Sequence, residues 1–192
     1  SGISQWTDKS GKNNHATQSG SNKPVYNSAA QEVYFDAPNG AWNSDKDDQN
    51  YFDIPAFTKG QNGDGTIDDP LTAGEVFVII KTDNQGENGG FHNWGTSIND
   101  VNYTWKGTIY DAFGSARRSW VATGYTQYHI YNAEVEETAG YKGRINGVQK
   151  AEHNSFGWGD SNKLGTNYGY NWLQGYIKEV IFFNRVLTEA ER

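Results

Sequence analysis

Short apolar and aromatic runs recur along this 192-residue chain, and clusters of Gly, Asn and Asp separate them. Runs of this length are typical of β-strands, and the clusters are typical of turns. No repeat of roughly 20–50 residues and no linker interrupts the pattern. The sequence therefore predicts one all-β domain over residues 1–192, folded as a two-sheet antiparallel β-sandwich. The expected strands cover residues 33–35, 51–54, 75–81, 108–110, 119–123, 128–133, 141–145 and 176–183.

Two of these runs are apolar on both faces. Residues 76–80 are continuously apolar, and residues 176–183 carry apolar side chains on both alternating faces. A strand covered on both sides shows this pattern, whereas a strand with one solvated face alternates with polar residues. We therefore expect both strands at the centre of a sheet.

Two local signals indicate where elements end or begin. Asn146-Gly147 supplies the positive φ values that a two-residue type I′ hairpin turn requires. The stretch from Thr188 to Glu191 matches a capping box, in which each residue satisfies a backbone N–H of the other. A helix is therefore expected to begin at Thr188.

Composition narrows the possible partners. Aromatic residues make up 15% of the chain, and each buries roughly 150–250 Å², so a core is possible despite a mean hydropathy of -0.83. The net charge of -7 argues against nucleic acid, whose phosphates it would repel, and is compatible with bound calcium. No stretch approaches the roughly 20 apolar residues that cross a bilayer, so membrane insertion is not expected.

Cysteine is absent. Disulfides, thiolate catalysis and cysteine-bound zinc are therefore excluded. An extracellular animal domain of this size would often carry a disulfide. The absence favours an extracellular protein of a bacterial cell surface or a virion.

A series of short motifs follows one order along the chain. Residues 6–16, from Trp6 to Ala16, form an opening loop, and residues 33–36, the strand at 76–81 and the closing strand at 176–183 come later. In this order they resemble the laminin-G-like (LamG) domains of the concanavalin A-like lectin/glucanase superfamily. The resemblance implies a jelly roll that serves as an adhesive module in large bacterial surface proteins or phage fibres. It carries no catalytic activity over.

Members of this family usually have a strand before the opening loop and a longer helix after the last strand. Neither is complete in this sequence. Either the ends have been trimmed, or neighbouring segments of a larger protein complete the sheet.

An acidic stretch at residues 60–69 suggests a metal site. Calcium takes 6–8 oxygen ligands, and side-chain oxygens at alternate positions around a Gly can surround one ion. The stretch lacks the first Asp and the final Glu of an EF-hand. The alternative is a solvated acidic turn with Asx hydrogen bonds. The candidate calcium ligands are Asn62, Asp64, Thr66, Asp68 and Asp69.

Two further polar stretches are more typical of loops. The acidic residues at 43–50 form a charge run of the kind that is usually solvated, although they could bind a cation. Asp8, with Asn13 and Asn14, is expected to hold the opening loop through side-chain-to-backbone hydrogen bonds.

The sequence also suggests two enzymatic alternatives. Glu134 and Glu136 would share a strand face like the paired carboxylates of a glycoside hydrolase, but a turn follows them. The residue types of a polysaccharide lyase are supplied by Gln127, Tyr128 and His129 together with Tyr131 and Arg117. A packed strand histidine is the competing interpretation, and neither alternative has the surrounding motif.

Aromatic residues in Gly-flanked segments are the candidate sugar contacts. Exposed rings could stack on sugar C–H faces while Asn and Asp bind hydroxyls. The alternative is that these rings belong to the core. The candidate ligand-binding residues are Trp94, Trp158, Tyr168, Tyr170 and Trp172.

The leading hypothesis is a non-catalytic recognition domain of a larger bacterial adhesin or phage fibre. It would bind glycan, with calcium as a possible cofactor. A structural or protein-interaction module without a sugar site is the first alternative. A polysaccharide-cleaving enzyme is the second.

Overall fold

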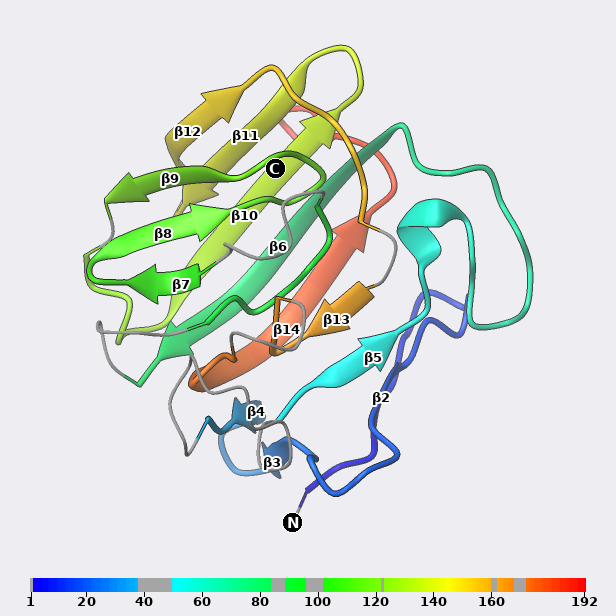
Figure 1. Cartoon of the computed structure of the whole chain (residues 1–192), viewed down its shortest axis with the longest axis vertical. Coiled ribbons are helices and arrows are strands. Elements are labelled where there is room, and N and C mark those ends of the chain that lie inside the picture. Colours follow the sequence, from blue (N-terminus) through cyan, green and yellow to red (C-terminus); the bar gives the residue numbers. More distant parts are fainter. Residues whose placement is uncertain are drawn as a thin grey trace.

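The computed structural model is an antiparallel β-sandwich, which confirms the all-β prediction (Figure 1). In the described part of the chain, the helical content is a single 3₁₀ turn, η1 (Phe57–Lys59). None of the helices described is long and apolar enough to span a membrane. The structure describes residues 2–37, 50–83, 89–95, 102–121, 123–159, 162–167 and 172–192.

The larger layer is a seven-stranded sheet in the order β12-β11-β10-β6-β14-β4-β3, with every neighbouring pair antiparallel. Its longest strands, β6 and β14, lie side by side near the middle, as the apolar runs predicted. The strands are β3 (Val25–Asn27), β4 (Glu32–Phe35), β6 (Ala73–Thr82), β10 (His129–Glu136), β11 (Gly140–Ile145), β12 (Val148–His153) and β14 (Gly175–Phe183).

Two smaller sheets lie over one face of the large sheet (Figure 1). One has the order β1-β2-β5-β13 and the other the order β7-β8-β9. Their strands are β1 (Gln5–Trp6), β2 (Ala16–Thr17), β5 (Phe52–Ile54), β13 (Asn162–Leu164), β7 (Asn102–Trp105), β8 (Thr108–Asp111) and β9 (Arg118–Val121).

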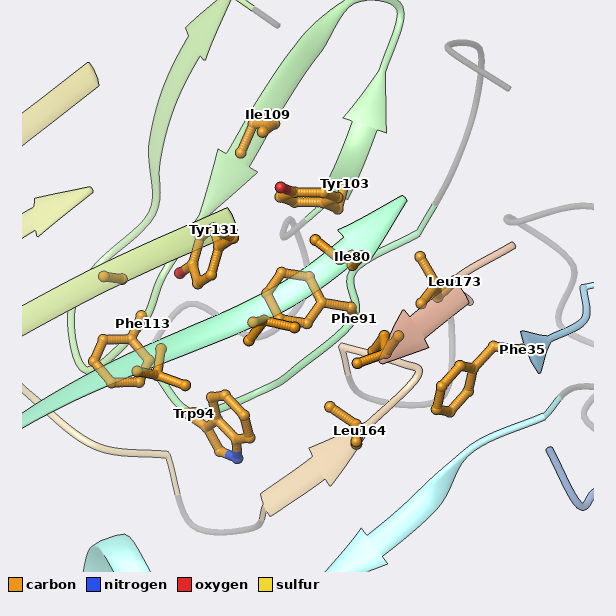
Figure 2. Packing of buried hydrophobic residues seen from close by; sticks show 14 of the residues in the cluster. Phe35, Ile80, Phe91, Trp94, Tyr103, Ile109, Phe113, Tyr131, Leu164 and Leu173 are labelled. Atoms are coloured by element: carbon orange, nitrogen blue, oxygen red, sulfur yellow. The ribbon is translucent and has the colours of Figure 1, made fainter. Parts of the chain in front are cut away.

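The core fills the space between the layers with aromatic and branched side chains (Figure 2). Phe91 is central, because its ring centroid lies 5.0 Å from those of Tyr103 and Tyr131 in edge-to-face geometry. Val78 and Ile80 of β6 are fully buried beneath these rings. Aromatic burial of this kind compensates for the low overall hydropathy.

Sequence and structure agree best on the long strands and tight turns. Each expected strand overlaps an observed one. Asn146 and Gly147 have φ angles of 50° and 78° between β11 and β12, which confirms the type I′ hairpin. At Thr188 the structure has a turn rather than a helix: Glu191 reaches back to the Thr188 N–H at 2.9 Å, and the backbone bonds run from Glu191 and Arg192 to the Thr188 carbonyl.

Candidate functional site

Three of the predicted sugar-contacting rings lie in the core. Trp94, Trp158 and Trp172 are 1%, 5% and 1% exposed. The Trp94 ring stacks on His92 at 4.9 Å, and Trp158 Nε1 donates to the Leu71 carbonyl at 2.7 Å. These rings serve packing, as the alternative interpretation held, and present no face to a sugar. Tyr168 and Tyr170 lie outside the described residues.

The acidic loop is docked on the opening loop. Asn14 Nδ2 donates to Asn62 Oδ1 at 3.2 Å, and the Gly63 N–H donates to Asn14 Oδ1 at 2.9 Å. A Cβ on Gly63 would lie 1.8 Å from the Asn13 carbonyl oxygen, so this close approach requires glycine. Lys12 Nζ lies 3.2 Å from Asp68 Oδ2 and joins the two loops by charge.

The oxygen atoms of this loop are already engaged by protein donors. Asp64 Oδ1 accepts from the Thr66 N–H at 2.9 Å and from its hydroxyl at 2.6 Å, and these bonds lower the pKa of Asp64. Asn62 Nδ2 donates to Asp68 Oδ2 at 2.9 Å, so an amide group points toward the would-be metal ligand. Asp69 is exposed. Among the described residues, no three His, Asp or Glu side chains gather as a metal group. The arrangement does not fit a calcium cage.

The opening loop is held as the sequence predicted. Asp8 accepts hydrogen bonds from the Ser10 N–H at 2.8 Å and from the Asn14 N–H at 2.9 Å. Partial burial opposes the ionised form, but these bonds outweigh it and lower the pKa of Asp8. The acidic residues at 43–49 lie outside the described part of the chain.

The lyase-type residues do not meet. His129 is 7% exposed and points into the core, where its Nε2 lies 2.5 Å from the Tyr103 hydroxyl. Tyr131 is fully buried and donates to Asp111 Oδ2 at 2.9 Å. The Arg117 guanidinium instead lies 5.1 Å from the centre of the Tyr110 ring.

The two carboxylates share one face of β10, as alternate residues do, but they differ in exposure. Glu134 is 6% exposed and accepts from Arg144 Nη1 at 2.7 Å and from Arg192. Glu136 is exposed at the end of β10. Glu134 is thus engaged by two arginine side chains, whereas Glu136 meets solvent.

The outer face of the large sheet carries a surface that the sequence patterns did not reveal. The cross-strand register places Tyr34 of β4 opposite Tyr176 of β14, and Tyr176 opposite Lys81 of β6. Their chain neighbours Val33 and Ile177 point into the core, so these three side chains point toward solvent.

The rings form a continuous row across the sheet. The Tyr34 and Tyr176 centroids lie 4.6 Å apart, and Lys81 Nζ lies 4.2 Å from the Tyr176 ring and 4.8 Å from the Tyr128 ring. Lys178 Nζ lies 4.4 Å from the Tyr128 ring. We call Tyr34, Tyr128, Tyr176, Lys81 and Lys178 the tyrosine row. All three rings are partly exposed.

Carboxylates border the tyrosine row. The Tyr34 hydroxyl donates to Asp83 Oδ2 at 3.1 Å, and the Tyr128 hydroxyl donates to Glu32. Burial and these carboxylates raise the pKa of both tyrosines above the ordinary value, so the hydroxyls remain protonated donors. The row thus offers partly exposed rings, ammonium donors and one exposed carboxylate, Asp83, on one surface, whereas Glu32 is only 6% exposed.

A weak signal for this row exists in the sequence. Tyr34 lies between Val33 and Phe35, and Tyr176 lies between Gly175 and Ile177, so each tyrosine occupies the opposite strand face from core residues. The pairing of β4 with β14 joins segments far apart in the chain. Alternation places each tyrosine outward, but it does not align the two strands.

Comparison with known proteins gives structural matches only. No family model and no curated protein sequence matches the chain. A Trypanosoma rangeli sialidase in complex with a difluorinated deoxy-nononic acid is 10% identical, with a TM-score of 0.63 over 92% of this chain and 28% of that one. The binding domain of botulinum neurotoxin DC in complex with rat synaptotagmin II is 9% identical, with a TM-score of 0.59 over 100% of this chain and 50% of that one.

A third match concerns botulinum neurotoxin type C, whose cell entry is described as dependent on interaction with two ganglioside molecules. It is 8% identical, with a TM-score of 0.53, and covers 100% of this chain and 49% of that one. The chain thus spans half or less of the length of these three structures. At such identities the matches show a shared jelly-roll β-sandwich fold.

Proposed function

We propose that the chain is a non-catalytic carbohydrate-recognition domain that binds saccharide on the tyrosine row. The observation that carries this proposal is the alignment of Tyr34, Tyr176 and Tyr128 across one solvent-facing surface. Partly exposed rings stack on the C–H faces of sugars, and the exposed Asp83 can accept hydrogen bonds from sugar hydroxyls. Each ring is held by a hydrogen bond or a lysine, which lowers the entropy lost on binding.

The similar structures support a glycan as the class of partner. One was solved with a nonulosonic acid derivative, and another is described through its dependence on gangliosides. One other was solved with a protein receptor, which favours a protein-interaction module as the second candidate.

Several observations support a role without catalysis. His129 and Tyr131 are buried in the core, and Glu134 is neutralised by arginines. Of the lyase-type and glycosidase-type residues that the sequence offered, these three are therefore engaged in packing or in ion pairs.

The setting that we propose is a bacterial adhesin or a phage fibre, outside the cell. The lack of cysteine, the net charge of -7 and the resemblance to adhesive LamG modules support it. The glycan test is run with and without calcium, because in the loop at residues 62–69 protein donors already bond Asp64 Oδ1 and Asp68 Oδ2.

A glycan array probed with the intact chain tests the proposal, with calcium in one arm and EDTA in the other. We expect a defined set of glycans to bind in both arms, and Tyr176→Ala to abolish the signal. Tyr26→Ala is the matched control, because Tyr26 is 44% exposed and pairs with the core-facing Val33, away from the row. An empty array in both arms would contradict glycan recognition and favour the protein-interaction module.

A further inference from the structure

Strand β14 is paired unevenly on its two sides. On one side it pairs with β6 along its whole length, from Gly175↔Thr82 to Phe183↔Glu75, with a bulge at Lys178. On the other side it pairs with β4 only at residues 175–177. No strand among the described residues pairs with that second edge at residues 178–183. The unpaired stretch is about 20 Å long at 3.3 Å per residue.

A cleft of about 700 Å³ follows this edge. Its lining includes the consecutive residues 178–184, with inward side chains such as Phe182 and outward ones such as Ile181. Because the cleft contacts both inward-pointing and outward-pointing side chains of β14, it borders the edge of the strand rather than one of its faces. The opposite wall comes from the small sheet and η1, through Trp6, Ile54 and Phe57.

The wall of the cleft includes a buried tryptophan whose indole N–H has no hydrogen-bond partner among the described residues. Trp94 lines the cleft and is 1% exposed, and its Nε1 has no partner. Figure 2 shows this nitrogen pointing away from Phe91 and Phe113. A buried N–H without an acceptor is unfavourable, so an occupant that brings an oxygen atom to this nitrogen would be stabilised.

The charges around the cleft are largely balanced. Lys12 pairs with Asp68 at 3.2 Å, and Asp8 accepts three hydrogen bonds within its own loop. Lys178 and Glu179 are neighbours at the other end. This balance does not select a strongly charged ligand.

We propose that the cleft accepts a single extended peptide segment, which adds to β14 as a further strand of the large sheet. The free N–H and C=O groups of residues 178–183 would pair with the main chain of the segment, as in β-strand addition. One face of the segment would lie under the small sheet, with a carbonyl within reach of Trp94 Nε1, and the other would meet solvent. The segment is therefore expected to alternate apolar and polar residues.

A second copy of this chain is a poorer fit. Pairing two β14 edges would bring a whole sheet toward the cleft, but the small sheet and the loop that carries Asp68 already bound it. A single strand has no such obstruction. Six paired residues would also remove an exposed strand edge, which proteins otherwise protect from aggregation.

NMR on the intact, ¹⁵N-labelled chain tests this proposal. The probe is a synthetic ten-residue peptide of alternating Val and Thr, and the control is the same sequence methylated at every backbone nitrogen. We expect the peptide to shift the amides of residues 178–183 and the indole N–H of Trp94, and the methylated control to bind at least tenfold more weakly. The amide of Tyr26 on β3, which does not pair with β14, serves as the internal reference.

Four results would overturn the proposal. They are shifts confined to other surfaces, no shifts at all, equal binding of the methylated control, and a concentration-dependent dimer that perturbs the same amides without peptide. Hydrogen exchange of the free chain adds an independent measurement. The proposal predicts that alternate amides within residues 178–183 exchange quickly, and uniform protection would show that the edge is already covered.

Discussion

At the scale of single residues, hydrogen bonds between buried polar groups fix how the strands pack around this core. Asp111 is 1% exposed and accepts from the hydroxyls of Tyr131 at 2.9 Å and Tyr141 at 2.5 Å, while His92 Nε2 lies 3.0 Å from its other oxygen. Burial alone would raise the pKa of Asp111, but these bonds outweigh it and lower the pKa. The same chemistry that suggests an active site therefore ties β8 to β10 and β11.

His129 gives a test of this interpretation through pH. Burial lowers the pKa of His129. As the pH falls, the histidine of the unfolded chain is therefore protonated first, at about pH 6.5, and that of the folded chain only at a lower pH. The contribution of His129 to the free energy of unfolding is therefore complete above the pKa of the unfolded chain. It is lost as the pH falls from there toward the pKa of the folded chain. Urea unfolding at pH 7.5 and 5.5 should show a larger loss for the native chain than for His129→Gln. Equal losses would contradict a buried, neutral His129.

The tryptophans show where single-residue inference reaches its limit. Gly-flanked Trp94 and Trp158 are equally compatible with a loop platform and with a core. The structure places both rings in the core. Two glycines allow the close approach: Gly114 packs against the Trp158 ring, and Gly95 packs against the backbone of Ala112. Such close approach depends on residues distant in the chain, which sequence alone does not align.

At the scale of elements, the acidic loop and the opening loop form one unit. The sequence predicted the internal hydrogen bonds of the opening loop, because Asx turns are local. It could not predict that Lys12 would reach Asp68, since residues 12 and 68 are brought together only by the fold.

Calcium provides the test of this unit. Because Asp64 and Asp68 are already bonded to Thr66, Asn62 and Lys12, we expect the same thermal midpoint in calcium and in EDTA. A ligand that binds the native state must raise its stability. A rise of several degrees in calcium would contradict this account and would favour a rearranged, metal-binding loop.

The C-terminal segment is held against the large sheet by Arg192. Its Nε lies 2.7 Å from Oε1 of the fully buried Glu75, and its guanidinium also contacts Glu134. Burial opposes ionisation of Glu75, but the bonds from Arg192 and its other donors lower its pKa. The sequence signal at Thr188 predicted a helix, whereas this anchoring accompanies a turn.

Arg192→Ala should lower the free energy of unfolding by about 2–3 kcal/mol, because Glu75 loses its charge partner but keeps Asn132 and the Leu187 N–H. Arg185→Ala is the control, since its pair with Glu191 is about half exposed and should contribute little. Urea unfolding of both variants measures the difference. Equal effects would contradict an anchoring role for Arg192.

At the scale of the whole molecule, strand periodicity was sufficient to predict the sandwich but not its surfaces. Residues 76–80 and 176–183 are apolar on both faces, which predicted the central strands β6 and β14. Six strands were not among those expected: β1, β2, β3, β7, β12 and β13. Strands of two or three residues carry no measurable period, and β12 was indicated only through the Asn146-Gly147 turn that precedes it. The tyrosine row and the cleft depend on cross-strand register, which requires the assembled sheet.

The two proposed surfaces lie in different places on the large sheet. The tyrosine row lies on the solvent face, and the cleft lies along the β14 edge beneath the small sheet. Lys178 belongs to both surfaces, but Tyr176 lies only in the row and Trp94 only at the cleft, so the two properties can be tested separately. Each can fail without affecting the other.

The most direct test of carbohydrate recognition is a calorimetric titration of one array-selected glycan into three proteins: the native chain, Tyr176→Ala and Tyr26→Ala. Loss of one stacking ring typically removes about 1–2 kcal/mol, so Tyr176→Ala should bind roughly ten-fold more weakly. Tyr26→Ala should bind as the native chain does. Equal affinity of the native chain and Tyr176→Ala would contradict the assignment of the tyrosine row as the binding surface.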